Sequence, residues 1–209
     1  MSQKHFILKG TFILTTAGLL TRVMGFFYRI FLGRSFSAEE IGLYQLIFPV
    51  YTLAFAATSA GIQTALARLV AAASAKKQHA KARSYLKAAL LCSLSLSFGF
   101  LFLIQKNAVF LAAVVLGEPR CASLISLMAY ALPFAALHSC TCGYFLGLRQ
   151  IRFPALSQLL EQFARILFVI LLYITGTHTA FHPPIAIAVL GLAGGEIFAA
   201  LLCIHALRN

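Results

Sequence analysis

The stretch that decides the fold runs from Thr11 to Leu32 and reads TFILTTAGLLTRVMGFFYRIFL. A helix rises 1.5 Å per residue, so this stretch is long enough to cross the roughly 30 Å hydrocarbon core of a membrane. Lys4 and Lys9 precede it, but the apolar residues continue through Arg22 without the small-residue cleavage site of a signal peptide. We therefore expect residues 11–32 to form a first transmembrane helix.

The rest of the chain repeats this pattern. Of the 209 residues, 61% are hydrophobic and only 11% are charged, whereas about a quarter of the residues of a soluble domain are charged. The sequence therefore predicts an all-α integral membrane protein, a six-helix bundle that forms a single membrane domain over residues 1–209. Pro49 and Pro133 fall inside expected helices and are predicted to bend them. The five further helices are expected near 43–72, 86–105, 122–147, 154–175 and 184–206.

The positive charges of the chain, which give it a net charge of +12, are distributed unevenly between the two expected sides of the membrane. Such a charge would suggest nucleic acid for a soluble protein, but here the basic residues lie between apolar runs, so no nucleic-acid partner is expected. The positive-inside rule instead predicts a cell-membrane protein with both termini in the cytoplasm, in contact with membrane lipids. One side receives Lys4, Lys9, Lys76, Lys77, Lys81, Arg83, Lys87, Arg149, Arg152 and Arg208, and the other only Arg34, Lys106 and Arg120.

Two GxxxG spacings, Gly143 to Gly147 and Gly191 to Gly195, fall in the fourth and sixth expected spans. Each removes side-chain bulk from one face of a helix, so that another helix can approach closely. Because such spacings are common in membrane helices, we interpret both as packing features inside one bundle.

Motifs for enzymatic chemistry are missing from the sequence. There is no GxxxxGK[ST] loop, no HExxH and no GxSxG, and all five acidic residues are Glu. The cysteines lack zinc-ligand spacing, and His138 is interpreted as a packed or hydrogen-bonded histidine. We therefore expect no enzyme, no cofactor and no metal site.

Ionisable residues at membrane depth are the strongest functional signal, because each costs about 2.5–3.5 kcal/mol at the centre of a helix. Arg22 lies in the first expected span, Glu161 and Arg165 in the fifth, and Glu196 in the sixth. Arg29 is seven residues beyond Arg22 and so projects from the same side of the helix. These side chains are expected to line an interior, water-filled cavity.

Arginines in such a cavity suit an anionic substrate, since the guanidinium group matches phosphate oxygens. We therefore predict Arg22, Arg29 and Arg165 as substrate-binding residues. Glu161 and Glu196 are candidates for ion coupling. The alternative is structural: Glu161 with Arg165, or Glu196 with Arg22, would then only hold helices in register.

Several stretches resemble the polysaccharide and lipid II flippases of the multidrug/oligosaccharidyl-lipid/polysaccharide exporter superfamily. The resemblance is carried by Lys9–Arg29, by Gly42–Pro49 with Ala60–Ala71, and by Phe153–Arg165. It implies a carrier that moves a polyprenyl-pyrophosphate-linked oligosaccharide across the cytoplasmic membrane for cell-wall, spore-cortex or surface-polysaccharide synthesis. Arg22 matches the first-helix arginine of the family. Arg29 lies one residue beyond the position of the second arginine of the lipid II flippases. This chain has Leu53 and Ala54 where lipid II flippases carry further arginines.

Members of this superfamily have two pseudo-symmetric lobes, so the chain resembles an N-terminal lobe whose C-terminal lobe is absent. The implied partner is that missing lobe or a second membrane chain. Two alternatives remain open from the sequence. One is a cation-coupled multidrug exporter of the same superfamily, although buried arginines outnumber buried acids. The other is a non-transporting membrane scaffold, which would not need Arg22 at all.

Overall fold

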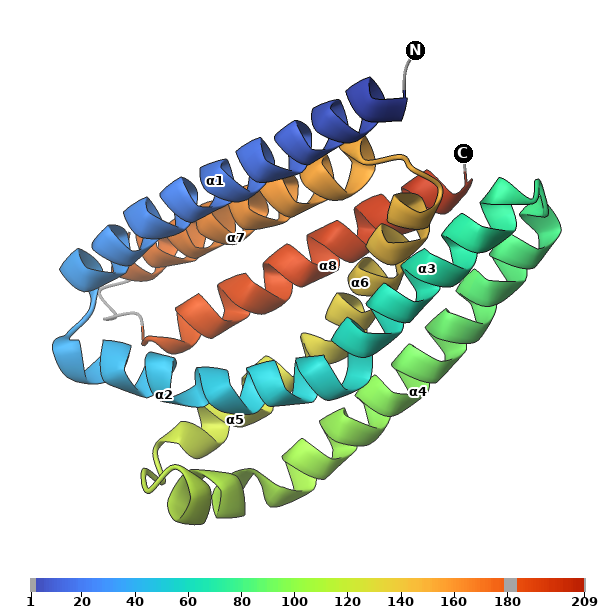
Figure 1. Cartoon of the computed structure of the whole chain (residues 1–209). Helices are drawn as coiled ribbons and strands as arrows, with labels where there is room; N and C mark the ends of the chain where they lie inside the picture. The colour runs from blue at the N-terminus through green and yellow to red at the C-terminus, as the bar shows by residue number, and fades with distance from the viewer. Residues whose placement is uncertain (1–2, 179–183, 209) are drawn as a thin grey trace.

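Ten helical segments make up the part of the chain that the computed structural model describes, residues 3–178 and 184–208. No strand occurs within those ranges. Figure 1 shows α1 alongside α7 on one side and α3 alongside α4 on the other, with α6 and α8 between them. The segments are α1 (Gln3–Ser35), α2 (Ala38–Phe55), η1 (Ala56–Ala60), α3 (Gly61–Ala75), α4 (His79–Phe110), η2 (Leu111–Val115), α5 (Cys121–Ala129), α6 (Leu132–Gly147), α7 (Arg152–His178) and α8 (Ala186–Arg208).

Large apolar side chains cover the outside of this bundle. Phe12, Leu53 and Phe102 are each more than 70% exposed. By contrast, the buried residues of α6 and α8 are mostly small, among them Ala, Gly, Ser and Cys. Apolar surfaces facing outward and small residues between helices are typical of membrane bundles. The predicted all-α membrane protein is confirmed: five spans are long and apolar enough to cross a membrane, or six when the bent pair α5 and α6 counts as one span.

The second span is interrupted after Phe55 by η1, a five-residue π-helical segment that separates α2 from α3. Pro49 was expected to bend this span. It lies inside α2, which continues beyond it to Phe55. A π-helical turn disturbs the regular backbone hydrogen bonds, and here a neighbouring helix satisfies one of the carbonyls. Ser93 of α4 donates its hydroxyl to the carbonyl of Thr58 at 2.7 Å. Both residues are fully buried.

The fourth span bends by 42° between α5 and α6. Pro133 is at the start of α6, directly after the break. A proline has no N–H and clashes with the preceding turn, which explains why one continuous helix over 122–147 does not form. The bend expected at Pro133 is therefore present, as a junction between two helices.

Both GxxxG pairs pack inside the bundle, as predicted. A Cβ atom at Gly143 would lie 2.8 Å from the carbonyl oxygen of Gln63 in α3. At Gly195 it would lie 3.0 Å from the Cβ atom of Arg165 and 3.1 Å from the carbonyl oxygen of Glu161 in α7. The glycines thus bring α6 against α3 and α8 against α7. The second approach places Glu196, the next residue of α8, beside the ionisable residues of α7.

Candidate functional site: an arginine cavity beside a histidine–glutamate cluster

A cavity of about 500 Å³ lies where α1, α2 and α7 meet. Its wall is mixed, with three aromatic rings, two amides and two guanidinium groups. None of the described residues that line it is acidic. The lining residues are Gly25, Tyr28, Arg29, Leu32, Ile41, Tyr44, Gln45, Phe48, Gln162 and Arg165. We call this space the arginine cavity.

Two of the three predicted substrate-binding arginines lie in its wall. Arg29 projects from α1 and is exposed. Arg165 comes from α7, and its side chain is only 18% exposed. Arg165 donates from Nη2 to Oε1 of Glu161, one helical turn earlier. Its Nε atom is buried and has no hydrogen-bond partner among the described residues, so the guanidinium group keeps unused donors.

Arg22 lies outside the wall of this cavity. It is exposed on α1, three residues before Gly25, which does line the cavity. Residues three apart lie on neighbouring parts of one helix face, so Arg22 belongs to the same side of α1 as Gly25 and Arg29. Its predicted role in substrate binding stays a prediction.

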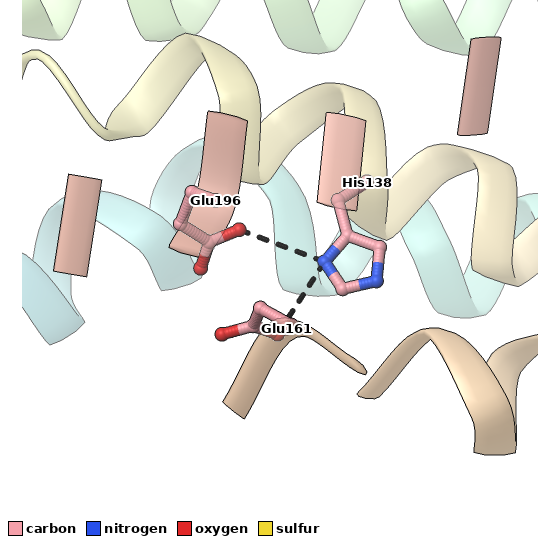
Figure 2. A group of neighbouring side chains, drawn as sticks. All are labelled: His138, Glu161 and Glu196. Atoms are coloured by element: carbon pink, nitrogen blue, oxygen red, sulfur yellow. Dashed lines mark ion pairs between the residues drawn. The ribbon is translucent and has the colours of Figure 1, made fainter. Parts of the chain in front are cut away.

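The second group of predicted residues comes together with a histidine. His138 of α6 faces both carboxylates with one ring nitrogen (Figure 2). Its Nδ1 atom lies 3.6 Å from Oε2 of Glu161 and 3.5 Å from Oε2 of Glu196. The side chains of His138, Glu161 and Glu196 are 10–14% exposed. We call these three residues the His–Glu cluster. Glu196 thus pairs with His138, while Arg22, its suggested partner, is exposed.

A smaller cavity of about 310 Å³ opens onto this cluster. Gln63, Ser139 and Gln158 also line it, and the hydroxyl of Ser139 donates to Oε1 of Gln63 at 2.9 Å. On the other side of the imidazole, Nε2 of His138 lies 2.7 Å from the hydroxyl of Ser157. The interior of the bundle therefore holds a polar region among mostly apolar side chains.

Glu161 connects the two regions. One carboxylate oxygen accepts from Arg165 in the wall of the arginine cavity, and the other faces His138. The predicted pair of Glu161 and Arg165 is therefore present. His138 was interpreted from the sequence as a packed or hydrogen-bonded histidine, and its hydrogen bond with Ser157 agrees with this. Its position beside both glutamates was not predicted, since it is far from them along the chain. The signal that could have found it is a histidine inside an apolar helix, where a polar side chain needs a partner.

The two regions suit opposite charges. Two guanidinium groups with spare donors can hold an anion such as a phosphate, whereas an imidazole nitrogen and two carboxylates can hold a cation. The cavity of about 500 Å³ falls within the usual range for small-molecule sites.

Comparison with known proteins identifies a family. Residues 7–208 match the family described as polysaccharide biosynthesis protein. Among curated proteins of Bacillus subtilis (strain 168), stage V sporulation protein B is 36% identical over 166 residues, which are 79% of this chain and 32% of that protein. Lipid II flippase MurJ is 27% identical over 178 residues, 81% of this chain and 32% of the relative. No solved structure matches the chain.

A third relative, the uncharacterized membrane protein YabM of the same organism, is 30% identical over 167 residues, 78% of this chain and 30% of that protein. The chain thus spans about a third of the length of the curated relatives that it matches.

Proposed function

Because the chain belongs to the polysaccharide biosynthesis protein family, we propose that it is the N-terminal lobe of a flippase for a polyprenyl-pyrophosphate-linked oligosaccharide. In this proposal the C-terminal lobe, or a second membrane chain, completes the transport pathway. The substrate is a precursor of the cell wall, spore cortex or a surface polysaccharide, and it crosses the cytoplasmic membrane.

The observation that carries the proposal is the arginine cavity. Arg29 and Arg165 reach it from two different helices, and the described residues in its wall include no carboxylate. A diphosphate would accept from both guanidinium groups and from the amides of Gln45 and Gln162. The Nε atom of Arg165 is buried without a hydrogen-bond partner among the described residues, and a buried donor of this kind favours binding of an acceptor.

Glu161 gives the site a way to release its ligand. It already accepts from Arg165, so a bound diphosphate would compete with it for the same guanidinium group. Binding would then be strong only while Glu161 is turned away or neutralised. A transporter needs such an exchange, because a site that held its substrate permanently could not release it on the other side.

A cation-coupled drug exporter would need acidic groups in the main cavity, and the arginine cavity has the opposite charge. The two acidic residues at membrane depth, Glu161 and Glu196, lie instead in the His–Glu cluster, next to a cavity of about 310 Å³. A membrane scaffold would need no charged interior. The half-buried Arg165 and the cavity beside it therefore favour the flippase over both alternatives.

The proposal is tested by ligand binding. The purified chain in lipid nanodiscs is titrated with a polyprenyl pyrophosphate, and with the corresponding polyprenyl alcohol as the uncharged reference. Arg29→Gln should weaken binding of the pyrophosphate by roughly tenfold or more, because hydrogen bonds to charged groups contribute about 1.5–3 kcal/mol. Arg165→Gln should act in the same direction.

Arg34→Gln is the matched control, since Arg34 is an exposed arginine of the same helix that lies outside the cavity wall. It should bind like the parent. If Arg29→Gln and Arg34→Gln bind the pyrophosphate equally well, or if the alcohol binds as tightly as the pyrophosphate, the arginine cavity is not a diphosphate site.

A further inference from the structure

The His–Glu cluster has the geometry of an ion site that three separate helices build together. His138 comes from α6, Glu161 from α7 and Glu196 from α8 (Figure 2). One ligand atom of each residue lies within 4.8 Å of the other two. Helix packing brings these atoms together, because Gly195 lets α8 approach α7 at the level of Glu161.

The spacing is too long for direct hydrogen bonds. The imidazole Nδ1 atom lies 3.5 Å and 3.6 Å from the two carboxylate oxygens, whereas such bonds between charged groups measure about 2.7–2.9 Å. Around a tetrahedral metal ion with bonds of about 2.0–2.1 Å, neighbouring ligand atoms lie roughly 3.3 Å apart. The two distances from Nδ1 of His138 are close to this value, and all three ligand atoms lie within 4.8 Å of one another.

Glu196 provides independent support. The residue is 8% exposed, and its Oε2 atom is buried without a hydrogen-bond partner among the described residues. That same atom faces Nδ1 of His138. A buried carboxylate oxygen without a hydrogen-bond donor is costly. A cation placed between the three ligand atoms would remove this cost.

The other side of the histidine is arranged as in metal sites. Nε2 of His138 and the hydroxyl of Ser157 are 2.7 Å apart. When Nε2–H donates to Ser157, the lone pair of Nδ1 points at the two carboxylates. Histidine ligands of metals usually donate their second N–H in this way, which sets the tautomer and the orientation of the ring.

We propose that His138, Glu161 and Glu196 bind one divalent transition-metal ion of the Zn²⁺ or Co²⁺ type, at a site separate from the arginine cavity. One imidazole nitrogen and two carboxylate oxygens suit such ions. The cavity of about 310 Å³ beside the cluster leaves space for water as a fourth ligand. The ion neutralises both carboxylates, so Glu161 no longer needs Arg165 as a counter-ion.

The test uses the untagged chain in detergent micelles, with Co²⁺ as a spectroscopic probe and Zn²⁺ in equilibrium dialysis. The parent should bind one ion per chain and give the visible absorption of Co²⁺ with four ligands. His138→Gln and Glu196→Gln should each lower the affinity by at least tenfold. Two controls, His79→Gln and Glu39→Gln, change an exposed histidine and an exposed glutamate and should bind like the parent.

Two further variants keep the test decisive if a ligand variant fails to fold. Ser157→Ala should weaken binding by about 10–100-fold, as loss of an outer partner of a metal ligand usually does. Arg165→Gln should tighten binding several-fold, because it removes a positive charge and the competitor for Glu161. A parent chain that takes up no ion overturns the proposal, as does equal binding by the cluster variants and the controls. None of these measurements needs a transport substrate, so the flippase proposal can fail independently.

Discussion

At the scale of single residues, the central feature is one carboxylate that serves two neighbours. Glu161 accepts from Arg165 through one oxygen and faces His138 through the other. Its side chain is 14% exposed and that of Arg165 is 18% exposed. At this depth neither charge is well hydrated, so each stabilises the other. The remaining donors of Arg165 and the remaining oxygen of Glu161 are what the anion site and the cation site would use.

Glu161→Gln should therefore destabilise the fold, because it leaves the Arg165 guanidinium group buried without its counter-ion. Breaking a buried pair from one side costs about 3 kcal/mol or more, measured as the free energy of unfolding in a detergent titration. The double variant Glu161→Gln/Arg165→Met should recover most of this loss. Glu118→Gln is the control, since it changes an exposed ion pair with Arg120, and its unfolding should match that of the parent. A Glu161→Gln chain as stable as the parent would contradict the pairing.

At the scale of helices, small residues decide which elements touch. Gly143 places α6 against the backbone of α3 at Gln63, and Gly195 places α8 against α7 at Glu161. In a membrane, close packing between helices takes over much of the role that the hydrophobic effect has in water. The functional side chains depend on these contacts, because the His–Glu cluster spans α6, α7 and α8.

Gly143→Ala tests this packing. The added methyl group would meet the carbonyl oxygen of Gln63 at 2.8 Å, and a backbone atom cannot move aside without shifting α3. We expect a loss of about 1–3 kcal/mol in the free energy of unfolding, as for other overpacked interiors. Gly99→Ala is the matched control, since Gly99 is exposed within α4 and its Cβ atom would meet nothing within 4 Å. That variant should be as stable as the parent or up to about 1 kcal/mol more stable, because alanine favours helix. Equal effects of the two changes would contradict the packing.

At the scale of the whole molecule, the two ends of the bundle differ in the charges that they carry. The N-terminus, the C-terminus and the α3–α4 connection lie at one end (Figure 1), and this end carries the basic residues predicted to be cytoplasmic. At the opposite end Arg120 pairs with Glu39 and Glu118. Hydrogen bonds from Arg120 hold the pKa of the Glu118 carboxyl below its ordinary value, so Glu118 stays ionised to a lower pH than an ordinary glutamate does.

This distribution predicts the orientation in the membrane. In a Cys92→Ser background, a single cysteine introduced as Ser84→Cys should react with a membrane-impermeant maleimide only when the inner face of the membrane is accessible. Pro119→Cys, next to Arg120 in the connection before α5, should react from the outside of intact cells. Both positions are exposed and lie at opposite ends of the bundle. Labelling of Ser84→Cys from outside would mean that the orientation is reversed.

Much of this architecture can be predicted from local patterns in the amino-acid sequence. The length of each apolar segment predicts its helix, because a membrane forces the backbone to form its hydrogen bonds within one segment. The bend at Pro133 also follows from local chemistry. The π-helical segment after Phe55 does not, since the hydroxyl that donates to its Thr58 carbonyl comes from Ser93 of another helix. At the site, the spacing of Glu161 and Arg165 predicts their pairing, and their depth predicts that they face inward.

Composition and periodicity alone determine that this chain is an integral membrane protein, a bundle of helices with ionisable residues at membrane depth. Only the tertiary structure decides that Arg29 and Arg165 share one cavity, that Arg22 stays outside its wall, and that His138 joins Glu161 and Glu196. The physical reason is that helix formation depends on neighbours along the chain. Contacts between side chains of different helices depend on how the helices pack. In this chain, that packing depends on the positions at which glycines let two backbones approach.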